Sequence, residues 1–270
     1  MSLSPAARAA AAGLAADPAG VLLGLDFDGT LAPVVAEPGT ALAHPASVAA
    51  LARLAPRLGR VAVVTGRPAL TAVRLGGLDR PGLERLLVLG QYGVERWEAA
   101  TGLVAPPVPD GIAGARRELL DLIERLGVPG LVLEEKGRAV ALHTRRAADP
   151  TATLHLVHGP VSRIARTHGL VVEPGRFVLE VRDGTLDKGG ALRGLVAASS
   201  PRSVVFVGDN LGDLPAFAAV AALAGTGIAG LAICSASAEQ PDLAAAADLV
   251  LDGPAGVAEW LTLLANLVDT

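Results

Sequence analysis

Four short apolar runs, each ended by a polar or glycine-containing turn, constrain the fold of this chain more than any other feature. They span residues 21–25, 61–64, 86–89 and 204–207. Continuous apolar runs of this kind are typical of parallel strands that are buried on both faces. A helical pattern over 46–58 separates the first two runs. The order strand, helix, strand therefore predicts an α/β fold with a doubly wound parallel sheet.

The middle of the chain follows a different pattern. It begins after a proline cluster at 106–109, which is typical of a linker, and Asp110 is a candidate N-cap for the helix that follows. In order, we expect a helix over 112–126, strands over 131–134 and 138–144, a helix over 150–168, and strands over 170–173 and 176–182. We predict an αββαββ domain at 108–183, inserted into a core formed by 1–107 and 184–270. After 204–207, the core is expected to continue with a helix over 214–224, strands over 231–234 and 249–251, and a helix over 257–268.

Composition argues against several classes of protein. Of the 270 residues 51% are apolar and 19% are charged, and the net charge is −4, which disfavours both intrinsic disorder and a nucleic-acid-binding surface. No apolar run reaches the ~20 residues that a membrane-spanning helix needs. Arg8 interrupts the alanine-rich stretch 6–16, which is therefore not typical of a signal peptide. The single cysteine, Cys234, excludes an internal disulfide, which fits a reducing compartment, and we expect a cytoplasmic protein. From the charge balance and the short apolar runs, we expect no membrane or nucleic-acid partner.

Two aspartates directly follow the first apolar run. Asp26 and Asp28 stand in the sequence DFDGTL at 26–31, and ligands of open α/β sheets bind at the carboxyl ends of strands. Two such carboxylates can share one phosphoryl group. One attacks phosphorus, while the other protonates the leaving alkoxide and later activates water. The alternative is an acidic turn that only ends the strand, since Asp-Gly is a common turn pair. The whole motif favours Asp26 as nucleophile and Asp28 as general acid and base.

The hexapeptide is the first signature of the haloacid dehalogenase superfamily, and the chain resembles that superfamily in three further motifs that come in the same order. Thr65, after the second apolar run, is similar to the hydroxyl residue that contacts phosphate. Lys188 is similar to the lysine that offsets charge on the nucleophile and the phosphate. Asp209 and Asp213 match the acids that follow a buried strand and hold magnesium. The resemblance implies a Rossmann-like catalytic core at 1–107 and 184–270, with 108–183 as its cap. The implied catalytic residues are Asp26, Asp28, Thr65 and Lys188.

The same resemblance implies Mg²⁺ as the cofactor. Magnesium prefers hard oxygen ligands in octahedral geometry and keeps several waters, so few protein ligands suffice. The implied ligands are the carboxylates of Asp26 and Asp209 and the backbone carbonyl of Asp28, with Asp213 binding directly or through water. The metal would offset the repulsion between the attacking carboxylate and a phosphate dianion.

Within the superfamily, the chain is similar to trehalose-phosphatases over nearly its whole length. The shared features are TGR at 65–67, GQYGVE at 90–95, LEEKG at 133–137, ALHTR at 141–145 and LEVR at 179–182. That family has an αββαββ cap, which the apolar pattern predicts independently. The resemblance implies hydrolysis of trehalose 6-phosphate, a small-molecule sugar phosphate, through an aspartyl-phosphate. The implied substrate-binding residues are Arg67, Gln91, Tyr92, Gly93, Glu134, Lys136, His143, Arg145 and Glu180.

The fourth motif departs from the pattern of trehalose-phosphatases. They usually read GDDxTDE where this chain reads GDNLGDL at 208–214, so that Asn210 replaces an acid and Gly212 replaces a threonine. Asn210 can still contact a metal-bound water, and we expect magnesium binding to persist but to be weaker or differently coordinated. Two alternatives stay open. One is another sugar- or polyol-phosphate phosphatase, such as a sucrose-phosphatase-like or glycosylglycerate-phosphate enzyme, and the other is a non-catalytic sugar-phosphate-binding module.

Overall fold

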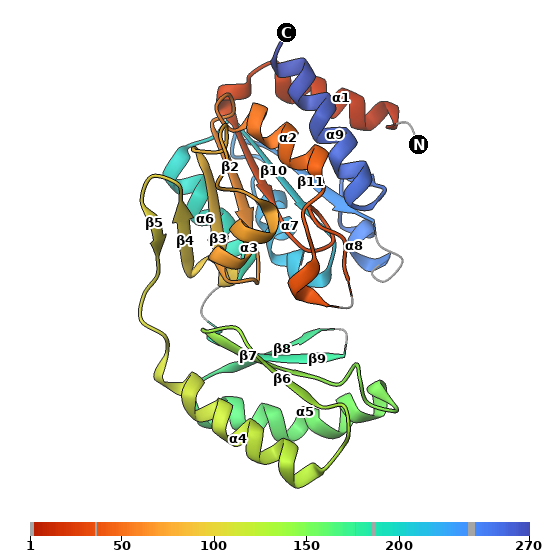
Figure 1. Ribbon diagram of the computed structural model, residues 1–270. Helices are drawn as coiled ribbons and strands as arrows, with labels where there is room; N and C mark the ends of the chain where they lie inside the picture. Colours follow the sequence, from red (N-terminus) through yellow and green to blue (C-terminus); the bar gives the residue numbers. More distant parts are fainter. Residues whose placement is uncertain (1–2, 36, 176, 185–186, 237–240) are drawn as a thin grey trace. The chain divides into compact units, whose positions relative to one another are not determined.

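The structure, a computed structural model, describes residues 3–35, 37–175, 177–184, 187–236 and 241–270 (Figure 1). It divides into two compact units. The core unit consists of residues 1–105 and 187–270, and the inserted unit consists of residues 106–186. None of the helices in the described ranges combines the length and apolar character that crossing a bilayer requires.

In the described part of the core unit, the strands form one eight-stranded sheet, which has a hydrophobic cluster on each face. Its strands, in order across the sheet, are β12 (Leu249–Leu251), β11 (Ala229–Ser235), β10 (Ser203–Gly208), β1 (Val21–Leu25), β2 (Arg60–Val64), β3 (Leu86–Gly90), β4 (Glu95–Glu98) and β5 (Gly102–Val104). The strands from β12 to β3 run parallel. Since β1 and β3 are buried at every position, their unbroken apolar sequence is what two covered faces require.

Helices cover both faces of this sheet, as Figure 1 shows. One face packs against α1 (Pro5–Ala15), α2 (Pro45–Leu54), α3 (Ala69–Gly76) and α9 (Gly253–Val268). The other packs against α6 (Lys188–Ser199), α7 (Leu214–Ala221) and α8 (Pro241–Ala245). Short 3₁₀ turns complete the unit at Pro18–Gly20, Pro38–Thr40, Gln91–Gly93 (η3) and Leu211–Asp213 (η4). The predicted doubly wound fold is confirmed.

The structure differs from the sequence prediction at several boundaries. The helix expected over 46–58 ends at Leu54, because Pro56 lies too near to let the backbone continue as a helix. The antiparallel strands β4 and β5 were not predicted, since three or four residues are too few to show an alternating pattern. The alanine-rich stretch forms α1, which packs on α9 and accepts a hydrogen bond at Ala7 O from Trp260 Nε1 at 3.0 Å.

The inserted unit is an antiparallel sheet covered by two helices. The helices are α4 (Asp110–Leu126) and α5 (Pro150–Thr167), and the sheet order is β6 (Val132–Glu135), β7 (Ala139–His143), β9 (Val178–Arg182) and β8 (Val171–Gly175). This is the predicted αββαββ order. Asp110 is the first residue of α4 rather than its N-cap, which is Pro109. Arg176, where the last strand was expected to begin, lies outside the described residues.

The register gives the inserted sheet one apolar and one polar face. Val140, Leu142, Leu179 and Val181 pack with apolar residues of α4 and α5. Glu134 pairs with Ala141, which pairs in turn with Glu180, so these three side chains lie on the opposite face from the helices. Glu134 and Glu180 therefore lie on the side of the sheet that no helix of the unit covers.

Candidate active site

Three of the predicted site residues follow neighbouring strands. Asp26 comes after β1, Thr65 after β2 and Asp209 after β10, and these strands are adjacent in the order β10, β1, β2. Because carboxyl ends of parallel strands meet at one edge of a sheet, the three side chains share that edge. All three are buried. Lys188, the first residue of α6, is a further predicted site residue, and its side chain contacts Asp26.

Lys188 joins two buried carboxylates. Its Nζ lies 2.8 Å from Asp26 Oδ2 and 2.7 Å from Asp213 Oδ1, and its side chain is only 4% exposed. Burial alone would lower the pKa of the Lys188 ammonium, but Asp213 and Asp26 more than offset that effect, and its pKa lies above the ordinary range. The residue therefore stays charged beside Asp26, where it can stabilise a phosphoryl group.

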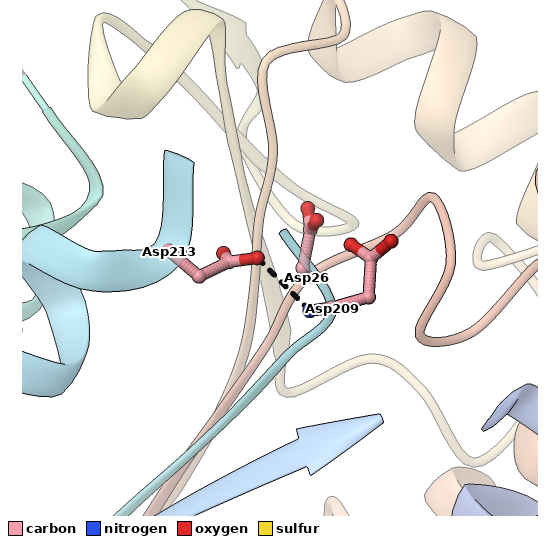
Figure 2. Close-up of side chains that lie close together, drawn as sticks. All are labelled: Asp26, Asp209 and Asp213. Atoms are coloured by element: carbon pink, nitrogen blue, oxygen red, sulfur yellow. Dashed lines mark hydrogen bonds between the residues drawn. The ribbon is translucent and has the colours of Figure 1, made fainter. Parts of the chain in front are cut away.

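Asp26, Asp209 and Asp213 form a buried acidic cluster, which Figure 2 shows. One carboxylate oxygen from each lies within 4.8 Å of the others. Burial, followed by the charge of Asp213, raises the pKa of Asp209 to about 7. Burial also raises the pKa of Asp26 well above its usual value, despite the opposing charge of Lys188. Carboxylate oxygens are hard ligands, and a divalent cation would offset the cost of ionising them together, so the cluster fits magnesium.

Gly29 lets the first motif approach the last one. Its φ is +72°, a left-handed value that glycine adopts without steric cost. A Cβ at this position would lie 1.9 Å from Asp209 Oδ2. A side chain at position 29 would therefore displace Asp209 from the acidic cluster.

Asp213 and Asn210 hold the loop after β10. Asp213 Oδ2 accepts the backbone N–H of Asp209 at 3.0 Å and that of Asn210 at 3.2 Å, while Oδ1 accepts from Lys188. The Asn210 side chain accepts the Gly212 N–H at 2.8 Å and donates from Nδ2 to Asp209 Oδ1 at 2.7 Å. A carboxylate at position 210 could not make that donation. The amide that departs from the expected motif therefore orients Asp209.

The turn at 65–67 rests on Gln91 and Tyr92. The Gln91 N–H donates to Arg67 O at 2.9 Å and its side chain to Gly66 O at 3.2 Å, while the Tyr92 N–H donates to Thr65 O at 3.0 Å. Gln91 and Tyr92 have φ values of 48° and 60°. A left-handed backbone at a residue other than glycine costs on the order of 1–3 kcal/mol, so the surrounding contacts must hold this conformation. A Cβ at Gly66 would lie 2.9 Å from the Tyr92 ring, so a larger residue there would displace that ring.

Arg67, predicted to bind substrate, forms an ion pair with Asp28. Its Nε and Nη2 are each 2.6 Å from a different Asp28 oxygen. Gly93, also predicted to bind substrate, ends η3 beside this turn. The structure thus brings together the core residues that the motifs pointed to, with Arg67 in direct contact with the predicted general acid.

Four of the five predicted sugar-binding residues of the inserted unit form two pairs. Lys136 Nζ contacts the Glu180 carboxylate, and His143 Nε2 lies 2.8 Å from Glu134 Oε2. Glu180 is 5% exposed, and its Oε1 accepts no hydrogen bond from the described residues. A buried carboxylate oxygen of this kind is suited to accept a hydrogen bond from a hydroxyl. Arg145, the fifth predicted residue, lies in the exposed turn after β7, two positions beyond His143.

A family model described as trehalose-phosphatase matches residues 24–251, more than half of the chain. The chain belongs to the trehalose-phosphatase family. The matched span runs from β1 to the end of β12, and it includes every site residue described above. The family resemblance that the motifs indicated is confirmed.

A curated trehalose-phosphate phosphatase from Mycobacterium marinum is 34% identical over 262 residues, which cover 91% of this chain and 61% of that protein. The chain spans about three fifths of the length of the curated relatives it matches. The C-terminal domain of the Candida albicans trehalose-6-phosphate phosphatase has a TM-score of 0.79 at 19% identity and covers 96% of both chains. A haloacid dehalogenase-like hydrolase from Bacteroides thetaiotaomicron has a TM-score of 0.62 at 17% identity, covering 89% of this chain and 97% of that one. At such identities these structures show the fold, which is the one the motifs implied.

One buried residue at the site of this trehalose-phosphatase family member was not predicted from the sequence. Ser235 ends β11, and its hydroxyl donates to Gly29 O at 2.6 Å. This bond fixes the loop that carries Asp26 and Asp28. The signal was present, because Ser235 follows an apolar run as Asp26, Thr65 and Asp209 do, and the same strand-end argument would have found it.

Proposed function

We propose that this chain hydrolyses trehalose 6-phosphate to trehalose and inorganic phosphate through an aspartyl-phosphate on Asp26. Membership of the trehalose-phosphatase family supports the substrate. The observation that carries the chemistry is the buried contact between Asp26 and Lys188. A phosphate dianion can approach a buried carboxylate only where a positive charge lies beside both, and Lys188 supplies that charge.

The chain's own residues account for both chemical steps. In the first, an Asp26 oxygen forms a bond to phosphorus, the bond from phosphorus to the sugar oxygen breaks, and Asp28 gives that oxygen a proton. In the second, water attacks phosphorus, Asp28 takes a proton from the water, and phosphate leaves Asp26. Thr65 Oγ1 accepts the Arg67 N–H at 3.1 Å, which leaves the hydroxyl proton to donate to a phosphoryl oxygen.

Magnesium is the proposed cofactor. Asp26, Asp209 and the backbone carbonyl of Asp28 would hold it, with Asp213 contributing directly or through water. When bound, the ion would neutralise negative charge that the phosphoryl group brings to Asp26. Both Asp213 oxygens already accept hydrogen bonds, which supports the indirect role for that residue.

The inserted unit is proposed to be the cap that selects the sugar, with the core unit as the catalytic domain. A disaccharide presents many hydroxyls, and a site with fixed polar groups discriminates among them because an analogue that lacks a hydroxyl leaves a buried group unpaired. The polar face with Glu134, Lys136, His143 and Glu180 offers such groups.

We place the protein in the cytoplasm, where its one buried thiol, Cys234, needs no partner.

A phosphate-release assay against a panel of sugar phosphates tests the proposal. Trehalose 6-phosphate is expected to be hydrolysed with the highest kcat/KM, ahead of sucrose 6-phosphate, glucosylglycerate phosphate and glucose 6-phosphate. Chelation of divalent ions is expected to stop release, and added Mg²⁺ to restore it. Preference for another sugar phosphate would overturn the proposed substrate. Full activity after exhaustive chelation would overturn the proposed magnesium requirement.

Substitution of Glu180 tests the cap. Glu180→Ala is expected to lower kcat/KM for trehalose 6-phosphate by about 10–100-fold, because a sugar hydroxyl loses its buried acceptor. Hydrolysis of p-nitrophenyl phosphate, which has no sugar, should change less than about twofold. Glu135→Ala is the matched control, since Glu135 lies one position from Glu134 and pairs with Arg116 of α4 at 2.7 Å. Equal losses on both substrates would point to damaged folding, and no loss on either would exclude Glu180 from the sugar site.

A further inference from the structure

Arg67 forms a bidentate ion pair with Asp28. The Arg67 Nε donates to Asp28 Oδ2 and Nη2 donates to Oδ1, both at 2.6 Å. The guanidinium carbon also lies 5.5 Å from the centre of the Phe27 ring. A planar guanidinium that bonds both oxygens of a carboxylate fixes its direction as well as its position. Asp28 cannot rotate about its last bond without breaking both hydrogen bonds.

The arginine is better anchored than the acid it holds. The Arg67 side chain is 13% exposed, while that of Asp28 is 35% exposed. The backbone of Arg67 is tied on both sides, by its N–H to Thr65 Oγ1 and by its carbonyl to the N–H of Gln91. The left-handed Gln91–Tyr92 pair therefore supports the turn at 65–67, and this turn sets the direction of the Arg67 side chain. A strained backbone held in place by its surroundings is often found where a functional side chain must be aimed.

The geometry points to Arg67 as a positioning residue that aims the Asp28 carboxyl group at the leaving oxygen of the sugar. This inference rests on the proposed phosphatase reaction, in which Asp28 transfers the proton. General acid catalysis requires the carboxyl oxygen within hydrogen-bond reach of the sugar oxygen, and a half-exposed side chain would otherwise sample other directions. Two N–H groups of Arg67 are directed at Asp28, so its effect on the reaction passes through that carboxylate.

A double-mutant cycle between Arg67 and Asp28 tests the inference. Arg67→Gln is expected to lower kcat for trehalose 6-phosphate by about 10–100-fold, part of the loss expected for removing a general acid, while KM changes less than about twofold. In an Asp28→Asn background, Arg67→Gln should cost less than about twofold more, because the group it aims is gone. Loss on p-nitrophenyl phosphate should be smaller, since a phenolate leaves without a full proton.

Two further variants separate aiming from folding. Arg67→Lys is expected to recover activity to within about tenfold of the wild type, because an ammonium can still donate to one Asp28 oxygen. Arg202→Gln is the matched control. Arg202 makes a similar fork to Asp17, with Nη2 2.6 Å from Oδ1, but precedes β10 at the opposite edge of the sheet. It should leave kcat unchanged, and the unfolding midpoints of all variants should be measured alongside.

The inference would be overturned if the fold-loss in kcat of the double variant equalled the product of the two single losses. It would also be overturned if Arg67→Gln raised KM and left kcat unchanged, since Arg67 would then bind the phosphate itself. Failure of the wild type to hydrolyse trehalose 6-phosphate would overturn only the proposed substrate. The same cycle, run with glucose 6-phosphate, would still separate coupled from independent losses.

Discussion

Asp26→Asn is expected to lose at least about a thousandfold in kcat on every phosphate ester, because an amide cannot attack phosphorus. The variant should nevertheless fold. Burial raises the pKa of Asp26, which means that the ionised carboxylate is costly in the folded chain, and an amide of the same shape removes that cost. The unfolding midpoint is expected to stay at or above that of the wild type.

Both outcomes are measured on one preparation, by phosphate release and by thermal unfolding. Acid-quenched wild-type protein incubated with substrate should also carry a mass increase of one phosphoryl group, which the variant should lack. Retention of a tenth or more of wild-type turnover by Asp26→Asn would exclude the aspartyl-phosphate mechanism.

Lys188→Met is expected to destabilise the core unit by about 3–5 kcal/mol, because it leaves Asp26 and Asp213 buried without their cation. Turnover should fall with it, since the charge that offsets the phosphate is lost. Urea unfolding of chelator-treated protein gives the stability change, because an added divalent ion could replace the missing charge.

The chain offers a matched control in Lys136→Met. Lys136 also contacts a buried carboxylate, that of Glu180, but its own side chain is 23% exposed. Because water can reach Lys136 and replace part of its contact, we expect Lys136→Met to destabilise the protein less than Lys188→Met does. Equal destabilisation by the two substitutions would show that the Lys188 contacts contribute no more than an ordinary partly exposed ion pair.

Much of the core could be predicted because its physical signal is local. A strand covered on both faces must be apolar at every position, so β1 and β3 are visible as unbroken runs. The residues that follow such runs, Asp26 and Asp209 among them, must share one edge of the sheet. The helices of the inserted unit could be predicted equally well, since the apolar residues of α4 and α5 recur at helical spacing and pack into one cluster.

The contacts between side chains could not be predicted. Arg67 and Asp28 stand 39 positions apart, and no periodicity links them. The roles of Gln91 and Tyr92 depend on a left-handed backbone that neither residue type favours. Asn210 was expected to leave magnesium binding weaker or differently coordinated, whereas its donation to Asp209 depends on a loop shape that three backbone N–H groups set by donating to side chains. Such features depend on the fold as a whole and carry no signature in the local sequence.

Arginine supplies nearly all of the basic charge of this chain, and Lys136 and Lys188 are its only lysines. Each belongs to a different unit and contacts a buried acid. Amine-specific reagents therefore have one side-chain target in each unit, beside the terminal amine. Lys136 is partly accessible in the native protein, whereas Lys188 becomes accessible only when the core opens. Acylation of the two amines thus reports separately on the polar face of the inserted unit and on the opening of the acidic cluster in the core unit, without any introduced label.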